Sequence, residues 1–168
     1  LSKLNKDKVV IRNMVALAQK IQVRIAFDPM EVFPGFNEEY ALSSCERRDL
    51  FSQILDFKKL GYPILNSFEF INHQISPAKY YCVQPSIFVN VCENGEILPF
   101  WCQKTNKVLG NLGKQSLGEI LHSAPYKEFT KKTDGCNLCN NSVTVETSLF
   151  YMPQTVLMNC LRLPSPII

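Results

Sequence analysis

The sequence predicts a mixed α/β (α+β) chain: two strand–helix units come first, and a small metal-binding region of one β-hairpin plus a helix follows. In the first half, short apolar segments alternate with amphipathic helices, a pattern typical of parallel strands. In the second half, Asn94 and Gly95 form a strong two-residue hairpin signal between strand-like residues. Four cysteines surround this hairpin: Cys82, Cys102, Cys136 and Cys139.

The composition limits the possible functions. The chain has 168 residues, of which 46% are hydrophobic, enough for one domain or two small ones with a real core. Its net charge of +3 comes from scattered side chains, so we expect no nucleic-acid partner. No apolar run approaches the roughly 20 residues that span a membrane, and no secretory signal is visible. We therefore expect a cytoplasmic protein without a membrane partner, in which cysteines favour metal binding over disulfide bonds.

The first unit consists of a helix and a strand. Residues 7–21 have the periodicity of an amphipathic helix. Its single apolar face carries Ile11, Met14, Val15, Ala18 and Ile21. Residues 23–27 are apolar except for Arg24 and are followed by Asp28 and Pro29, which predicts a short buried strand that ends there.

The second unit repeats this order. Ser43 and Glu46 have the spacing of a capping box, which predicts the start of a long helix. Residues 62–66 are the next short strand, and Ser67 is placed to cap a third helix. The long helix supplies the crossover that parallel pairing needs. Because two strands do not make a stable parallel sheet, we expect further strands before Leu1 and interpret the chain as a piece of a longer protein.

The second half has a different character. Residues 87–91 and 96–101 are the two predicted strands of the hairpin. Ser116 and Glu119 form a second capping box, which predicts a short helix. Residues 150–163 are apolar at helical spacing, and we expect this tail to pack on the body of the protein.

The four cysteines have the pattern of one metal site. The hairpin would bring Cys102 back towards Cys82, and the Cys-x-x-Cys of Cys136 and Cys139 would close the site. Four thiolates suit an iron–sulfur cluster or zinc. A third interpretation is that the four cysteines are free or oxidised thiols. Zinc ribbons usually present two short Cys-x-x-Cys knuckles. One pair here is split by a whole hairpin, which favours a [4Fe–4S] cluster.

The remaining cysteines and the two histidines have simpler interpretations. A lone cysteine in a strand is more often a small buried hydrophobe than a ligand, which is the interpretation of Cys92. Cys160 lies in the apolar tail and Cys45 at a helix start, where structural roles are expected. His73 and His122 lie far from the cysteines in sequence, at expected helix ends, where capping or solvent contact accounts for them.

Together these motifs resemble the C-terminal region of radical S-adenosylmethionine enzymes of the SPASM/twitch group. The resemblance is carried by Cys82, the hairpin 91–99 leading to Cys102, residues 108–111, residues 116–121 and residues 135–139. The first half resembles the last two βα units of that family's partial (β/α) barrel. The resemblance implies three regions: barrel units in 1–80, a small twitch/SPASM-like hairpin-plus-helix metal-binding domain in 81–149, and the tail in 150–168.

The resemblance implies that Cys82, Cys102, Cys136 and Cys139 hold one auxiliary [4Fe–4S] cluster, with Zn²⁺ as the alternative metal. Residues 140–151 contain no further cysteine, as in the single-cluster twitch variant. The family's Cys-x3-Cys-x2-Cys motif, which binds the cluster that cleaves S-adenosylmethionine, is absent. We therefore expect the chain alone to be inactive, although the longer parent protein would be a radical S-adenosylmethionine enzyme.

The implied partners are the N-terminal half of the barrel, the cofactor S-adenosylmethionine bound by the parent protein, and an unknown peptide or small-molecule substrate. In this family an auxiliary cluster relays an electron or shapes the substrate pocket. The strand ends near Phe27 and Asn66 would face the cofactor pocket. The alternative from another class is a zinc-stabilised, non-enzymatic interaction domain.

Overall fold

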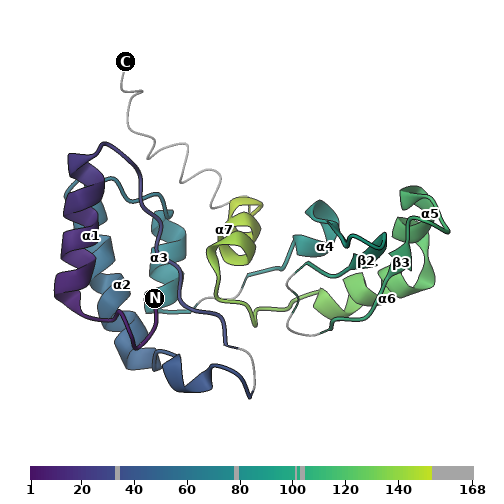
Figure 1. Cartoon of the computed structure of the whole chain (residues 1–168), viewed down its shortest axis with the longest axis horizontal. Helices are drawn as coiled ribbons and strands as arrows, with labels where there is room; N and C mark the ends of the chain where they lie inside the picture. The colour runs from purple at the N-terminus through teal and green to yellow at the C-terminus, as the bar shows by residue number, and fades with distance from the viewer. Residues whose placement is uncertain (33–34, 78–79, 101, 103–104, 153–168) are drawn as a thin grey trace. The chain divides into compact units, whose positions relative to one another are not determined.

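The computed structural model describes residues 1–32, 35–77, 80–100, 102 and 105–152 (Figure 1). It divides into two compact units. The first comprises Leu1–Ala78 and Asn140–Leu149, and the second comprises Lys79–Cys139 and Phe150–Ile168. The segment 140–149, placed by the sequence with the cysteines, thus belongs to the first unit. Most of the predicted apolar tail, including Cys160, lies outside the described residues.

Helices dominate the first unit. They are α1 (Lys8–Lys20), α2 (Ser44–Lys59), α3 (Phe68–Ile75) and α7 (Ser142–Phe150), with the short 3₁₀ helix η1 (Glu38–Tyr40) before α2. The predicted starts of α2 and α3 are confirmed, because Ser43 and Ser67 accept hydrogen bonds from the backbone of the first turns. Asp7 caps α1 in the same way.

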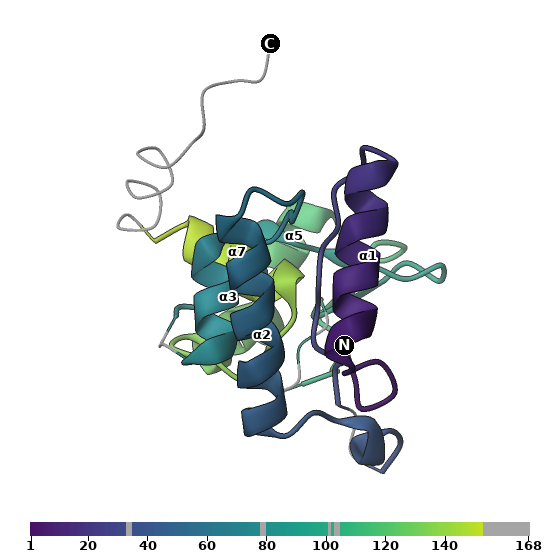
Figure 2. The same ribbon diagram turned by 90° about the vertical axis from the view of Figure 1, so that its left-hand side faces the viewer.

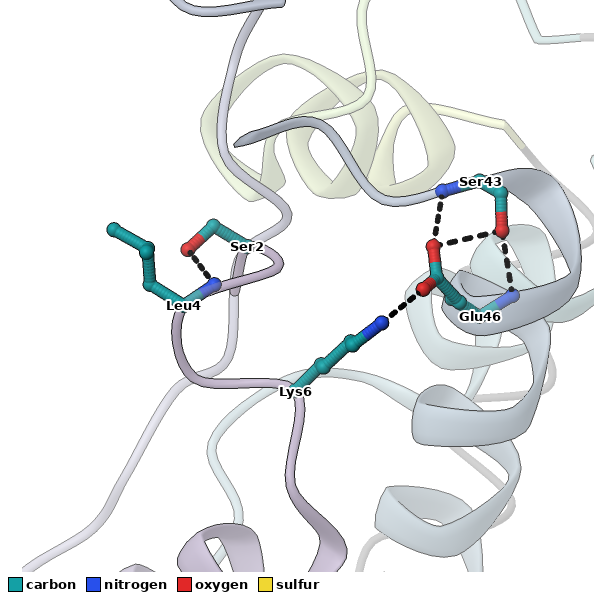
Figure 3. A network of polar contacts seen from close by, with 5 residues as sticks. All are labelled: Ser2, Leu4, Lys6, Ser43 and Glu46. Atoms are coloured by element: carbon teal, nitrogen blue, oxygen red, sulfur yellow. Dashed lines mark hydrogen bonds and ion pairs between the residues drawn. The ribbon is translucent and has the colours of Figure 1, made fainter. Parts of the chain in front are cut away.

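The start of α2 is tied to the N-terminal segment (Figure 3). Glu46 N donates to Ser43 Oγ over 3.3 Å, and Ser43 N donates to the Glu46 carboxylate over 2.8 Å, which completes the capping box. The ammonium group of Lys6 forms an ion pair with the same carboxylate. These contacts lower the pKa of Glu46 to about 2, with the Lys6 hydrogen bond as the largest cause.

The two predicted strands of the first unit pair in parallel, as expected. Ile25 and Ile64 form a parallel bridge: Ile25 N donates to Pro63 O over 2.9 Å, and Leu65 N donates to Ile25 O over 2.8 Å. The pairing is a single bridge between extended segments, so the predicted strands are present only as this short contact.

The core of the first unit lies between the helices and this parallel pair. It contains Ile11, Val15, Phe27, Leu50, Phe51, Ile54, Ile64, Phe70, Ile71 and Val145, each at most 5% exposed. Phe51 of α2 and Phe70 of α3 meet edge to face with ring centroids 6.0 Å apart. Figure 2 shows α2 and α3 side by side, and α1 lies on the side of α2 that faces away from α3. The sequence placed Met14 and Ile21 on the same apolar face of α1 as Ile11, but they are 39% and 55% exposed.

The second unit is built around a small antiparallel sheet. Its elements are α4 (Gln84–Ile87), β1 (Asn90–Val91), β2 (Glu96–Leu98), β3 (Gly110–Asn111), α5 (Leu117–His122) and α6 (Ala124–Thr133). The strand order is β1-β2-β3, and the predicted hairpin joins β1 to β2 with Gly95 at a φ of +79°. The strands are shorter than predicted, and β3 extends the hairpin by one strand.

One side of this sheet is covered by α5 and α6. The buried cluster contains Ile97, Leu109, Ile120, Tyr126 and Phe129. Gly110 of β3 lies directly over Ile120 of α5, so that a Cβ atom at Gly110 would lie 2.7 Å from Ile120 Cγ1. The close approach of strand and helix therefore depends on a glycine at this position. Among the described residues, no helix is long and apolar enough to cross a membrane.

Candidate metal centre

The Cys-x-x-Cys loop follows α6 through a tight turn. Gly135 has a φ of +64°, a conformation that glycine adopts without strain. Cys136 N then donates to Thr133 O over 3.0 Å, which fixes the start of the loop on the end of α6. Cys136 and Cys139 are 8% and 7% exposed, so both thiols lie largely out of water.

A buried tyrosine links this loop to the segment that precedes Cys82. Tyr80 is 2% exposed, and its hydroxyl donates to Cys139 O over 3.0 Å. Burial raises the pKa of Tyr80, and the nearby sulfurs of Cys139, Cys82 and Cys136 raise it further. The hydrogen bond of Tyr80 therefore ties the segment just before Cys82 to the Cys-x-x-Cys loop, although 53 residues separate Cys82 from Cys136.

The fourth predicted ligand, Cys102, is half-buried against the cluster of Ile97 and Ile120. Within the described residues, no group of three or more cysteine, histidine or acidic side chains is arranged to hold a metal ion. The donor set has the right chemistry for a thiolate-bound metal. The closed four-cysteine arrangement stays a prediction.

The other candidates lie in ordinary structural positions. Cys92 N donates to Glu96 O over 2.8 Å inside the hairpin, and Cys45 is exposed in the first turn of α2. His122 Nδ1 contacts Gly118 O at 2.8 Å near the end of α5, and His73 is buried in α3 of the first unit. Cys45 and His122 match the structural interpretations made from the sequence. His73 is 5% exposed, so the expected solvent contact is wrong, and Cys92 is half-buried rather than buried.

The ends of the parallel segments in the first unit are also polar. The Asp28 carboxylate accepts hydrogen bonds from the backbone N–H and hydroxyl of Ser142 at the start of α7, the latter over 2.7 Å. Asn66 is 1% exposed, and its Oδ1 accepts from Phe27 N over 2.6 Å. Its Nδ2 has no acceptor among the described residues.

The sequence did not single out Glu146 of α7, which lies at the same end of the parallel pair. Its carboxylate accepts a hydrogen bond from Ser67 N, and burial raises its pKa. No local pattern connects Glu146 with Ser67, because 79 positions separate them.

Comparison with known families shows what the region of the four cysteines is similar to. Residues 82–141 match the family model of SPASM, described as an iron–sulfur cluster-binding domain. This region is therefore similar to SPASM domains. Tyr80 lies two residues before its first matched position, and the match covers all four predicted ligands from Cys82 to Cys139.

A curated relative supports the same assignment. The chain is 34% identical over 87 residues to the S-adenosyl-L-methionine-dependent 2-deoxy-scyllo-inosamine dehydrogenase of Niallia circulans. The match covers 46% of this chain and 34% of the relative, so the chain spans about a third of that protein's length. No solved structure matches the chain. Together with the SPASM match, this relative confirms the resemblance to radical S-adenosylmethionine enzymes that was predicted from the cysteine and hairpin motifs.

Proposed function

We propose that the SPASM-like region binds one [4Fe–4S] cluster through Cys82, Cys102, Cys136 and Cys139. The observation that supports this proposal is the buried hydrogen bond from the Tyr80 hydroxyl to Cys139 O, which ties the segment just before Cys82 to the Cys-x-x-Cys loop. Cys102 would complete the set from the segment that follows β2. Thiolates are the usual ligands of such clusters.

We further propose that the chain is the auxiliary-cluster and substrate-side module of a radical S-adenosylmethionine enzyme. A cluster held by four cysteines has no open iron, so it supplies electron transfer or orders the chain around it. The relative from Niallia circulans is a dehydrogenase, and an oxidation of this kind needs an electron acceptor. An electron relay, together with shaping of the substrate pocket, is therefore the role proposed for the SPASM-like region.

The chain's own residues would prepare this site in two ways. The burial of Cys136 and Cys139 keeps water away from the bound group, and exclusion of solvent is one of the factors that set a cluster's potential. Tyr80 holds the backbone of Cys139 in place, so the loop has a defined position before any metal arrives.

The first unit would form the substrate side. Asn66 presents a buried amide donor without an acceptor among the described residues, at the end of a parallel segment where α/β proteins commonly bind ligands. A buried donor without a partner costs about 1–3 kcal/mol, so an acceptor on a substrate or cofactor would stabilise this end of the pair. The proposed partners are the N-terminal half of the barrel, which would bind S-adenosylmethionine, and a peptide or small-molecule substrate.

Anaerobic purification followed by iron and sulfide reconstitution tests the metal. We expect about four iron atoms per chain and broad absorption near ~400 nm, as for thiolate-bound iron–sulfur clusters. Cys82→Ser and Cys136→Ser should each lower the iron content, whereas Cys45→Ser, far from the site in sequence, should not.

The same preparation distinguishes the alternatives. One tightly bound zinc per chain, with no iron uptake, would assign the domain to the zinc-stabilised interaction class instead. Equal iron loss in all three serine variants would indicate general misfolding and would contradict the ligand assignment.

A further inference from the structure

The three residues that follow Cys139 are each hydrogen-bonded to a side chain of the first unit. We call residues 140–142 the exit segment, because the chain leaves the Cys-x-x-Cys loop through them. The bonds join Gln74 Nε2 to Asn140 O, Asn141 Nδ2 to the Glu31 carboxylate, and Ser142 N and Oγ to the Asp28 carboxylate. The boundary between the two units falls directly after Cys139, so the backbone next to the last predicted ligand is held by the first unit.

The bond from Gln74 differs from the other two, because it does not serve helix α7. Asn141 caps this helix, since its Oδ1 accepts from Thr144 N over 2.8 Å. Asn140 precedes the cap and is not part of the helix. The bond of 2.8 Å from Gln74 Nε2 to Asn140 O therefore fixes only the backbone between Cys139 and the cap.

The burial of Gln74 gives this bond a small net effect on stability. Gln74 lies in the last turn of α3 and is 1% exposed. Its Nε2 is hydrogen-bonded, but its Oε1 has no partner among the described residues. The gain from one bond is thus offset by the loss of a solvated acceptor. An apolar side chain of the same length would fill the space without this loss, so the specific contribution of the amide is the position of Asn140.

Two consecutive carbonyl groups are held in this way. Cys139 O accepts from the Tyr80 hydroxyl over 3.0 Å, and Asn140 O accepts from Gln74 Nε2 over 2.8 Å. Both donor side chains are at most 2% exposed. Because each peptide group is planar and only two dihedral angles per residue are soft, holding two successive carbonyls fixes the course of the backbone at Asn140. The backbone that carries the Cys139 side chain is thereby restrained on its C-terminal side.

We propose that Gln74 is a positioning residue for Cys139: by holding Asn140 O, it fixes the backbone that directs the Cys139 thiol into the metal site. Gln74 lies outside the residues 82–141 that match the SPASM model, so the first unit contributes to the site through this one side chain. A ligand that is fixed before binding loses less conformational entropy when the metal arrives. The inference rests on the proposed function, because Cys139 is a ligand only if the region binds a cluster.

The test compares two glutamine-to-methionine variants of the whole chain. Gln74→Met keeps the length of the side chain and removes the donor to Asn140 O. Gln53→Met is the matched control in the same unit, because Gln53 Nε2 also donates to a backbone carbonyl, that of Lys8 over 3.3 Å, and its Oε1 also has no partner among the described residues. The two variants lose the same kind of bond, but only the first loses it at the exit segment.

The first measurement needs no metal. The metal-free chain is treated with iodoacetamide, and mass spectrometry gives the rate of alkylation at each cysteine. In Gln74→Met, Cys139 should react about tenfold faster than in the unmodified chain, as expected for the loss of one buried hydrogen bond. Cys92 should react at an unchanged rate, and Gln53→Met should change neither rate. Equal acceleration at Cys92, or an unchanged rate at Cys139, would overturn the proposal.

The second measurement uses the anaerobically reconstituted chain. Both variants should take up as much iron as the unmodified chain, but Gln74→Met should release it to a chelator about tenfold faster. The electron paramagnetic resonance spectrum of its reduced cluster should also change, because the spectrum depends on the ligand geometry and not on the stability of the fold. A release rate and spectrum equal to those of Gln53→Met would overturn the proposal.

The outcomes separate this inference from the proposed function. If the unmodified chain takes up no iron, the cluster assignment is wrong, and the alkylation rates still decide whether Gln74 positions Cys139. If Gln74→Met loses the helical circular dichroism of the unmodified chain, Gln74→Leu repeats both measurements with a second apolar side chain. The same accelerations at Cys139 are expected there, and their absence would overturn the positioning role.

Discussion

The hydroxyl of Tyr80 donates a hydrogen bond of 3.0 Å to the backbone carbonyl of Cys139, across 59 positions of sequence. The bond joins the segment that leads into Cys82 to the Cys-x-x-Cys loop, the two ends of the SPASM-like region. Because both groups are buried, neither has water as a substitute partner. Tyr80 therefore positions the Cys-x-x-Cys loop relative to Cys82 before any metal is bound.

Replacing Tyr80 with phenylalanine should loosen this loop. Tyr80→Phe removes the donor and leaves the Cys139 carbonyl unsatisfied, which should cost about 1–3 kcal/mol of unfolding free energy in the metal-free chain. Denaturant unfolding measures the loss, and the rate at which a chelator removes iron from the reconstituted chain should rise. Tyr81→Phe is the matched control, because Tyr81 is 66% exposed. Equal effects of the two variants would show that the Tyr80 hydroxyl has no positioning role.

The contact between β3 and α5 gives a second prediction. In Gly110→Ala the new methyl group would lie 2.7–2.8 Å from two carbons of Ile120, and overpacking of this kind typically costs about 1–3 kcal/mol. Thermal or denaturant unfolding should show this loss, and adding Ile120→Val should recover part of it. Gly118→Ala should cause no loss, since nothing lies within 4 Å of a Cβ there. A Gly110→Ala chain as stable as the original would contradict the described packing.

Local signals were enough to predict the helix starts. Ser43 with Glu46 and Ser116 with Glu119 form complete capping boxes, as their spacing indicated, because the bonds involved join residues three apart. The hairpin at Gly95 could also be predicted from neighbouring residues alone, because its turn depends on a positive φ that glycine favours.

Long-range contacts were not visible in the sequence. Strand β3 is only Gly110 and Asn111, residues of low strand propensity, and it forms because the missing side chain of Gly110 lets Ile120 approach. The hydrogen bond of Tyr80 and the placement of α7 in the first unit also depend on tertiary packing. For α1 the periodicity of the sequence correctly predicted an apolar helix face. It did not predict that Met14 and Ile21 would remain exposed.

The ion pair of Glu46 predicts a pH effect at the start of α2. Its pKa is lowered from 4.5 to about 2, chiefly by the hydrogen bond from Lys6. A carboxyl group whose pKa is lower in the folded chain stabilises the fold above its unfolded pKa, and this contribution is lost as the pH falls from about 4.5 through about 2. Carboxyl NMR titration should place Glu46 near the lower value, and Lys6→Met should raise it. Lys8→Met serves as control, and a pKa that is insensitive to Lys6 would contradict the ion pair.

The chain alone should not cleave S-adenosylmethionine, even after reconstitution and reduction. The resemblance to the radical enzymes implies that cleavage needs a cluster with three cysteine ligands from Cys-x3-Cys-x2-Cys and one iron left open for the cofactor. This sequence contains no such motif, and a cluster held by Cys82, Cys102, Cys136 and Cys139 would have no open iron.

Chromatography of the reduced mixture should therefore detect no 5′-deoxyadenosine above the protein-free control. Detection of the product would imply that one of the four cysteines is not a ligand. If the N-terminal barrel half docks as proposed, adding it should restore cleavage, whereas a zinc-binding interaction domain would gain no activity from the same addition.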